Sequence, residues 1–175
     1  MTLPVSIEDA RTQLRAEPGE RDDEITSFIL DAAAWVEQYT GHILEARDVV
    51  ERFRAPARSI ELRAWPINHD AAPVISYTGP NGPGTVDLVR LDLSRRPARV
   101  LPGLGLCWPV FDPAQSLTVT IRAGYENPAD VPRNFRRAML VLIGAYDEDR
   151  EGGAVLAAAE VAATRLCRGF KVHRL

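Results

Sequence analysis

Residues 22–41, DDEITSFILDAAAWVEQYTG, have the clearest structural meaning in this chain. Apolar residues recur there in steps of three and four, at Ile25, Phe28, Ile29, Ala32, Val36 and Tyr39. This spacing places them on one stripe of an α-helix and leaves the polar residues on the other side. Asp22 and Asp23 are suited to cap its first turn, and Gly41 is suited to end it. The stretch therefore predicts an acidic, amphipathic helix with one buried face.

Three further helices are predicted, one before this stretch and two near the C-terminus. Ser6, with Asp9 three residues later, can cap the first of them. The third helix begins near Pro132, which suits a first helical turn, and should run to about Arg150. The fourth should span residues 154–168, where alanine is frequent.

Between the second and third helices, the sequence changes to the alternating pattern of β-strands. Strands are expected over residues 49–54, 59–63, 74–77, 86–89, 99–101 and 117–125. The Gly- and Pro-rich residues 79–84 should form a hairpin tip, with residues 86–89 as the return strand. The sequence thus predicts an α+β fold, a mainly helical bundle of about four helices with a β-rich insertion between the second and third.

The chain length of 175 residues fits a single domain with one core. We expect this domain to consist of four consecutive parts: N-terminal helices (1–41), a β-rich insertion (46–125), C-terminal helices (131–168) and a basic, extended tail (169–175). A hydrophobic content of 46% and a charged content of 26% are typical of a folded protein. No apolar run approaches the roughly 20 residues of a membrane-spanning helix, and residues 1–4 lack the features of a secretory signal.

Charge is distributed unevenly along the chain. The net charge of −3 gives no general attraction for nucleic acid, and Arg95, Arg96 and Arg99 are only a weak basic cluster. Residues 1–31 are strongly acidic, whereas residues 165–175 carry basic side chains and no acid. Opposite charge at the two ends suits contacts with different partners, and it is equally compatible with solvated helix faces.

No pattern of catalytic or metal-binding residues is recognisable. The histidines and cysteines lack the spacing of metal ligands or catalytic pairs: His42, His69, His173, Cys107 and Cys167. Residues 103–105 lack the Lys and Ser/Thr that follow a phosphate-binding loop. The charged residues 147–151 are consecutive and should point around a helix. We therefore expect a protein without enzymatic activity, cofactor or metal.

Several short motifs occur in a characteristic order along nearly the whole chain. They are Val5-Ser6-Ile7-Glu8-Asp9-Ala10, Asp22-Asp23-Glu24-Ile25, Ala32-Ala33-Ala34-Trp35-Val36-Glu37-Gln38-Tyr39-Thr40-Gly41, Trp65-Pro66-Ile67, Val74-Ile75-Ser76-Tyr77, Arg122-Ala123-Gly124-Tyr125, Val131-Pro132, Ala138-Met139-Leu140 and Tyr146-Asp147-Glu148-Asp149-Arg150-Glu151. Although no single motif is specific, the ordered set resembles the head–tail connector (adaptor) proteins of long-tailed phages and of phage-derived gene transfer agents. The resemblance is to the branch of that family with a β-rich insertion.

This resemblance implies a structural subunit of a dodecameric ring below the portal of a phage or gene transfer agent, closed by heterologous contacts. Such a ring extends the DNA channel and joins head to tail. The implied partners are the portal protein, a tail-side stopper or head-completion protein, other copies of the chain, and genomic DNA passing without sequence-specific binding. No cofactor and no membrane are implied. The location would be the virion head–tail interface, after assembly in the bacterial cytoplasm.

The resemblance also points to three groups of candidate residues. The portal-docking candidates are Arg165, Arg168, Phe170, Lys171 and Arg174. The candidates for an inter-subunit or tail-side loop are Asn81, Gly82, Arg95 and Arg96. The candidates for channel-facing acids are Asp22, Asp23, Glu24 and Asp31. A DNA-packaging accessory protein that binds DNA directly is the alternative, which a salt-dependent affinity for DNA would favour.

Overall fold

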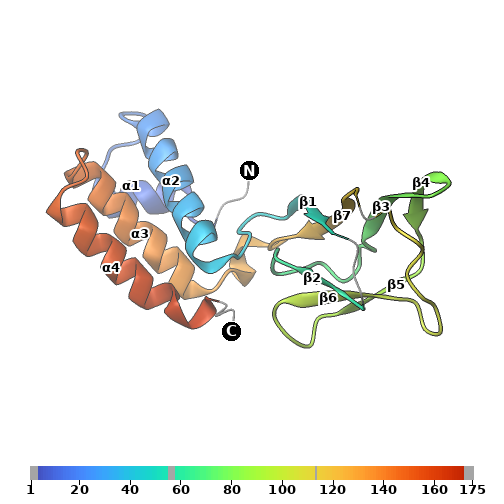
Figure 1. Cartoon of the computed structure of the whole chain (residues 1–175). Coiled ribbons are helices and arrows are strands. Elements are labelled where there is room, and N and C mark those ends of the chain that lie inside the picture. Colours follow the sequence, from blue (N-terminus) through green and yellow to red (C-terminus); the bar gives the residue numbers. More distant parts are fainter. Residues whose placement is uncertain (1–3, 55–57, 113, 172–175) are drawn as a thin grey trace. The chain divides into compact units, whose positions relative to one another are not determined.

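The computed structural model describes residues 4–54, 58–112 and 114–171, and its elements are labelled in Figure 1. The helices are α1 (Ile7–Leu14), α2 (Asp22–Thr40), η1 (Pro128–Asp130), α3 (Arg133–Glu148), α4 (Ala154–Cys167) and η2 (Arg168–Phe170). The strands are β1 (Arg47–Phe53), β2 (Ile60–Leu62), β3 (Val74–Gly79), β4 (Gly82–Val86), β5 (Val89–Asp92), β6 (Ala98–Pro102) and β7 (Leu117–Ala123). The described residues form four α-helices and two antiparallel sheets, which confirms the predicted α+β class.

The chain divides into two compact units. The helical unit comprises Met1–Glu45 and Tyr125–Leu175, and the β-unit comprises Ala46–Gly124. In the described residues, no helix is long and apolar enough to cross a membrane.

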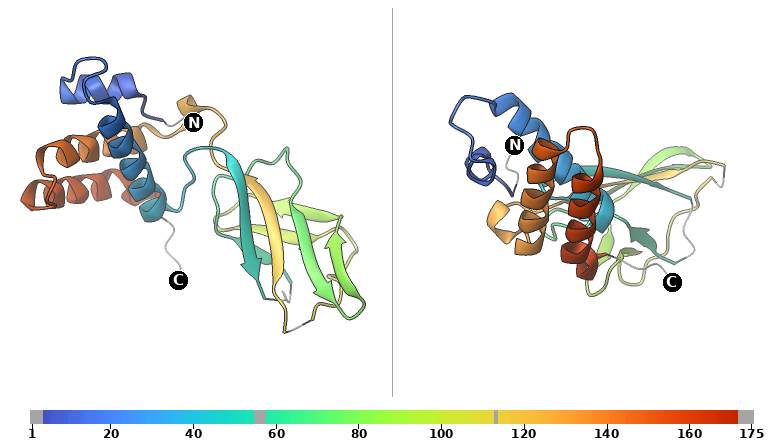
Figure 2. Two further views of the ribbon diagram at one scale, coloured as in Figure 1. Left: turned by 90° about the horizontal axis from the view of Figure 1, so that it is seen from above. Right: turned by 90° about the vertical axis from the view of Figure 1, so that its left-hand side faces the viewer.

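The helical unit is built around the apolar faces of α2 and α3. The predicted stripe of α2 is confirmed, because Ile25, Ile29, Ala32 and Val36 are buried. They pack in one cluster with the largest buried side chains of α3, which are Phe135, Met139, Leu142 and Ile143. Helix α4 lies beside α3 in both views of Figure 2. Its buried face consists of Ala159, Ala163 and Cys167, small residues that allow the two helices to approach closely.

The helix ends confirm some sequence predictions and correct others. Ser6 and Asp9 form the expected capping box on α1, and Gly41 ends α2 in the left-handed conformation, with φ of 67°. The predicted capping of α2 by aspartate side chains is wrong, since its N-cap is Arg21 and makes no side-chain cap bond. Asp22 is the first helical residue, and its carboxylate instead accepts hydrogen bonds from Arg11 of α1.

The β-unit contains a four-stranded sheet in the order β1-β7-β3-β4 and a three-stranded sheet in the order β2-β6-β5. Figure 2 shows the strands of the larger sheet side by side. Along β7 every second residue is buried, which confirms the alternation seen in the sequence. The carboxylate of Glu51 on β1 accepts hydrogen bonds from the backbone N–H groups of Arg63 (2.9 Å) and Ala64 (2.8 Å), just beyond β2. Glu51 therefore joins the two sheets.

The predicted return strand of the hairpin is misplaced. β3 and β4 meet in a tight turn that pairs Gly79 with Gly82, and Gly82 has φ of +105°, which favours glycine. The return is therefore Gly82–Val86. Residue 89, expected at the end of the return strand, belongs instead to β5 in the other sheet. Gly82, Pro83 and Gly84, which were expected in the hairpin tip, are part of β4 itself.

Candidate docking surfaces

The basic C-terminal candidates lie at the end of α4 and in η2. Arg165 and Arg168 are exposed. Phe170 is half-buried and packs edge-on against Phe135, with ring centroids 4.7 Å apart. The Nζ atom of Lys171 lies 4.7 Å from the centroid of the Tyr39 ring, a cation–π contact with α2. Residues 168–170 thus form a 3₁₀ turn held on the helical unit instead of an extended tail. Arg174 lies outside the described residues.

Phe170 is held in place by a buried histidine whose sequence context showed only that it lacks the spacing of a metal ligand or catalytic pair. The His42 ring is 5% exposed and lies edge-on to both Phe135 and Phe170, at 5.0 and 6.0 Å between ring centroids. Its Nδ1 atom is 2.9 Å from the hydroxyl oxygen of Tyr125, and the hydroxyl oxygen of Thr40 accepts a hydrogen bond from its backbone N–H. This packing fixes the position of Phe170 on the helical unit.

Two arginines that the sequence analysis did not select lie at the same end of the helical unit. The side-chain amide of Asn134, in the first turn of α3, donates a hydrogen bond to the carbonyl oxygen of Leu166 at 3.1 Å. The start of α3 is therefore next to the end of α4. Arg133 and Arg137 are exposed and one helical turn apart on α3. Their i,i+4 spacing opposite the apolar face of α3 was the available sequence signal, but only the helix packing brings them towards Arg165 and Arg168.

The four candidate channel-facing acids have different environments. Asp22 pairs with Arg11, and the hydrogen bond from Arg11 is the main cause that lowers the pKa of its carboxyl group. Glu24 pairs with Arg21 at 2.6 Å and with Arg150 at 2.8 Å. By contrast, the exposed side chains of Asp23 and Asp31 form no ion pair within the described residues.

Glu24 belongs to a network of charges that links α2 to the end of α3. Arg21 also contacts the carboxylate of Asp147, and its hydrogen bonds to Glu24 and Asp147 raise the pKa of its guanidinium group. Asp149 accepts hydrogen bonds from the backbone N–H groups of Gly153 and Leu156, which lower the pKa of its carboxyl group. The run of charges at 147–151, which the sequence predicted only to point around a helix, thus connects helices and caps α4.

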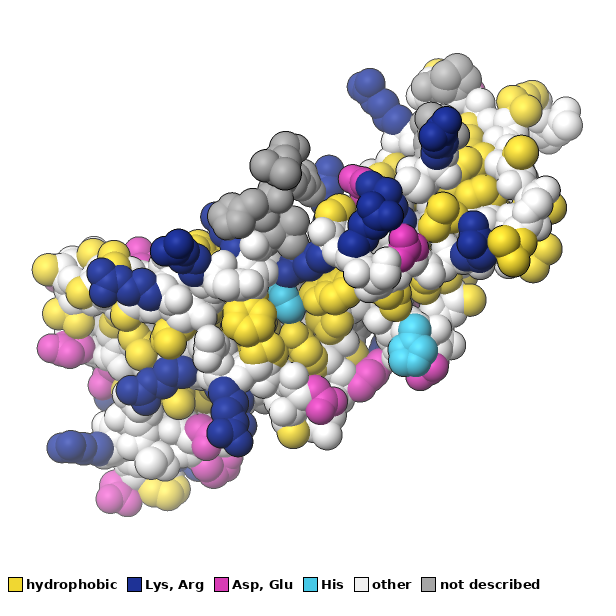
Figure 3. Space-filling model, turned by 90° about the horizontal axis from the view of Figure 1, so that it is seen from below, with side chains coloured by type: hydrophobic (Ala, Val, Ile, Leu, Met, Phe, Trp, Pro, Cys, Tyr) yellow, Lys and Arg dark blue, Asp and Glu magenta, His cyan; other side chains and the backbone are white. Residues whose placement is uncertain are grey.

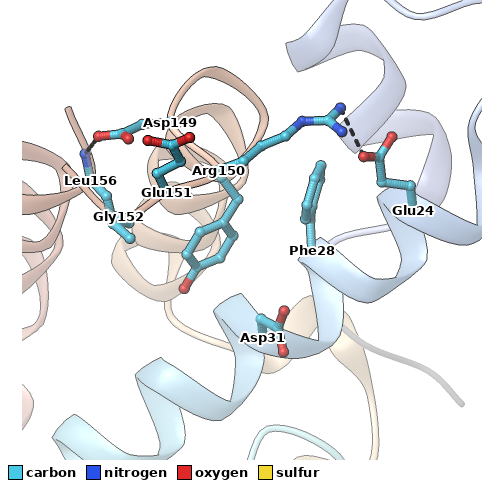
Figure 4. Close-up of a pocket in the computed structure, with 9 residues that line it drawn as sticks. Glu24, Phe28, Asp31, Asp149, Arg150, Glu151, Gly152 and Leu156 are labelled. Atoms are coloured by element: carbon cyan, nitrogen blue, oxygen red, sulfur yellow. Dashed lines mark hydrogen bonds and ion pairs between the residues drawn. The ribbon is translucent and has the colours of Figure 1, made fainter.

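A pocket of about 420 Å³ lies next to this network. Figure 4 shows Phe28 and Asp31 of α2 on one side, and Arg150 and Glu151 after α3 on the other. Tyr146 also lines the pocket, and burial is the main cause that raises the pKa of its hydroxyl group. In the described part of the chain, no group of three or more His, Cys, Asp or Glu residues could hold a metal ion. The pocket combines aromatic walls with carboxylates and one arginine.

The loop candidates of the β-unit lie in two different turns. Asn81 and Gly82 are in the β3–β4 turn of the larger sheet, where Asn81 is exposed. Arg95 and Arg96 follow β5 in the smaller sheet. Arg95 lies 3.7 Å from the carboxylate of Asp92, and the Arg96 guanidinium lies 5.8 Å from the centre of the Trp65 ring. The turns belong to different sheets, so the four residues do not form one loop.

The β-unit also exposes an apolar surface around residues 88 and 104–110, to which the sequence assigned no role. Figure 3 shows hydrophobic side chains at the surface of this unit. Its most exposed large examples are Leu104 (82%), Val110 (73%) and Leu88 (66%). The loop is anchored by Trp108, whose indole N–H donates to the carbonyl oxygen of Arg58 at 3.0 Å. The available sequence signal was the absence of charged residues from 100 to 111.

No protein-family model and no curated protein matches the sequence. Solved structures do match. A chain in the neck of an empty gene transfer agent particle, computed with C6 symmetry, is 21% identical, with a TM-score of 0.78 over 98% of this chain and 91% of that chain. A chain in the virion of a native gene transfer agent particle is 20% identical, with a TM-score of 0.79 over 100% of this chain and 94% of that chain.

A chain in the neck of a native particle, computed with C12 symmetry, is 22% identical, with a TM-score of 0.71 over 89% of this chain and 85% of that chain. These likenesses show that the fold is shared with chains of gene transfer agent necks and virions. They are consistent with the head–tail connector family that the ordered sequence motifs indicated.

Proposed function

We propose that this chain is a structural neck subunit, a head–tail connector of a gene transfer agent or tailed phage. The observation that carries the proposal is the shared fold over 98–100% of the chain with chains of such particles. In this proposal the subunits form a dodecameric ring below the portal, which extends the DNA channel and joins head to tail. The β-unit serves as an insertion between the second and third helices of one connector domain. The protein needs complementary surfaces and no catalysis.

The candidate residues take specific roles in this assembly. Arg165, Arg168 and Lys171 dock on the portal in this proposal, together with Arg174, which lies outside the described residues, while Phe170 fixes the segment to its own subunit. Asp23 and Asp31 are better placed than Asp22 and Glu24 to present negative charge to DNA, because the latter two are paired with arginines. The hairpin turn at Asn81 and Gly82, and the turn with Arg95 and Arg96, would contact a neighbouring subunit or a tail-side protein.

A pull-down with the cognate portal protein, followed by negative-stain imaging, tests the proposal. Full-length protein should form rings stacked on portals. Truncation after Arg165 would also remove Cys167 and Phe170, which pack in the helical unit. The sharper variant is therefore truncation after Lys171, combined with reversal of Arg165 and Arg168 to glutamate. Absence of portal association, together with salt-sensitive binding to duplex DNA, would favour the DNA-packaging accessory instead.

A further inference from the structure

One end of the helical unit gathers cations from two helices. This cationic end consists of Arg133 and Arg137 of α3, Arg165 and Arg168 near the end of α4, and Lys171. The hydrogen bond from Asn134 to the Leu166 carbonyl brings these two helix ends together. All five cationic side chains are exposed. Within the described residues, none of the four arginines forms an ion pair, so their charge is available to a partner.

Most other arginines of the same unit are used differently, although the exposed Arg15 at the end of α1 also has no ion pair within the described residues. Arg11, Arg21, Arg136 and Arg150 each pair with a carboxylate within the unit. Exposed acids such as Asp23, Glu148 and Glu151 lie where α2 and α4 begin and α3 ends, while the exposed Asp130 of η1 lies just before α3 in the sequence. The unit therefore has carboxylates that could neutralise the cationic end, yet within the described residues none of them pairs with its arginines. Internal stability does not explain these unpaired charges.

The position of Arg133 is unfavourable for the helix that carries it. Backbone dipoles give a helix N-terminus a partial positive charge, which favours acids and disfavours arginines. The first turn of α3 contains no acidic residue. Arg136 is compensated by Asp9 at 3.2 Å, but Arg133 and Arg137 have no such partner among the described residues. A residue that opposes the helix dipole and has no compensating ion pair in its own subunit is characteristic of a functional surface.

We propose that the cationic end is one composite docking surface for an acidic protein surface, with α3 contributing as much as the C-terminal segment. Beside it, Lys171 covers Tyr39, whose ring stacks on Trp35 with centroids 5.2 Å apart. Arginine, tyrosine and tryptophan are the residues that dominate protein–protein binding energy. Duplex DNA is the less suitable partner, because the net charge of −3 gives the chain no general attraction for a phosphate backbone. The inference rests on the proposed function in taking the portal protein as the partner.

The test measures binding of full-length chain to purified cognate portal rings, and separately to a duplex of about 30 base pairs, at about 50 and 200 mM salt. The variants are Arg133→Glu/Arg137→Glu and Arg165→Glu/Arg168→Glu. The control is Arg52→Glu/Arg63→Glu, which makes the same change in charge on exposed arginines of the β-unit that form no ion pair with any residue the structure describes. Circular dichroism checks that each variant is folded. We expect each variant of the cationic end to weaken portal binding by about tenfold or more, and the control by less than about twofold.

The outcomes separate this inference from the proposed function. If wild type binds portals and the α3 variant loses no more affinity than the control, the composite surface is wrong while the connector function stands. If wild type binds duplex DNA but not portals, and the same variants abolish that binding, the protein partner and the connector function are both overturned.

Discussion

Replacing Phe170 with alanine tests whether one aromatic side chain holds the C-terminal segment on the helical unit. Its ring centroid lies 4.7 Å from that of the fully buried Phe135 and 6.0 Å from that of His42. Truncating a fully buried phenylalanine costs about 3–5 kcal/mol, and an aromatic pair contributes about 0.5–1.5 kcal/mol of such a loss. Because Phe170 is only half-buried, we expect Phe170→Ala to lower the free energy of unfolding by about 2 kcal/mol.

Urea unfolding followed by far-ultraviolet circular dichroism measures this change on the full chain, since the signal comes mainly from the helices. Val161→Ala is the matched control, because Val161 is on α4 and 52% exposed. Its effect should stay within about 0.5 kcal/mol. If Phe170→Ala were no more destabilising than this control, Phe170 would not anchor the segment and would be free to bind a partner.

Three further predictions concern other contacts. Backbone hydrogen bonds lower the pKa of Asp149, so the stability that its carboxylate contributes is complete above the unfolded value of 3.8 and is lost as the pH falls through the lower folded pKa. The thermal midpoint of Asp149→Ala should therefore be lower than that of wild type at pH 7, and it should change less during acid titration. Glu51→Ala removes the acceptor of the Arg63 N–H, so hydrogen exchange of that amide, measured by NMR, should accelerate by at least about tenfold. Burial raises the pKa of Cys167 to about 11, whereas Cys107 is exposed; mass spectrometry after iodoacetamide treatment at pH 8 should find the adduct on Cys107, and equal labelling of Cys167 would contradict its burial.

Local periodicity was sufficient to predict the helices and the clearest strand. The spacing of apolar residues in α2 and the strict alternation in β7 each reflect one buried face, and both patterns can be recognised within a short stretch of sequence. The hairpin return could not be placed in the same way. Its position depends on a turn between Gly79 and Gly82 that lets a proline and two glycines lie within β4. Residues typical of turns therefore concealed a strand.

Surface roles were harder to predict because they depend on contacts between distant segments. Asp22 appeared to be a cap or a channel-facing acid, and its pairing with Arg11 follows only from the packing of α1 on α2. Phe170 appeared to be a docking residue, yet its ring packs against Phe135 and His42, which are distant in the sequence. The charge pattern of the sequence identified the basic C-terminal residues, but it gave no indication that the arginines at the start of α3 lie near them.

The position of Arg133 allows stability and docking to be separated in one variant. Arginine in the first turn of α3 opposes the helix dipole, whereas glutamate there complements it. Arg133→Glu should therefore raise the free energy of unfolding by about 0.5 kcal/mol, measured by urea titration, while it weakens binding to the portal. A gain in stability together with a loss of binding is expected when a residue is retained for a partner at the expense of its own fold. If the variant were less stable than wild type, Arg133 would have an internal role, and the argument that its charge is kept for docking would fail.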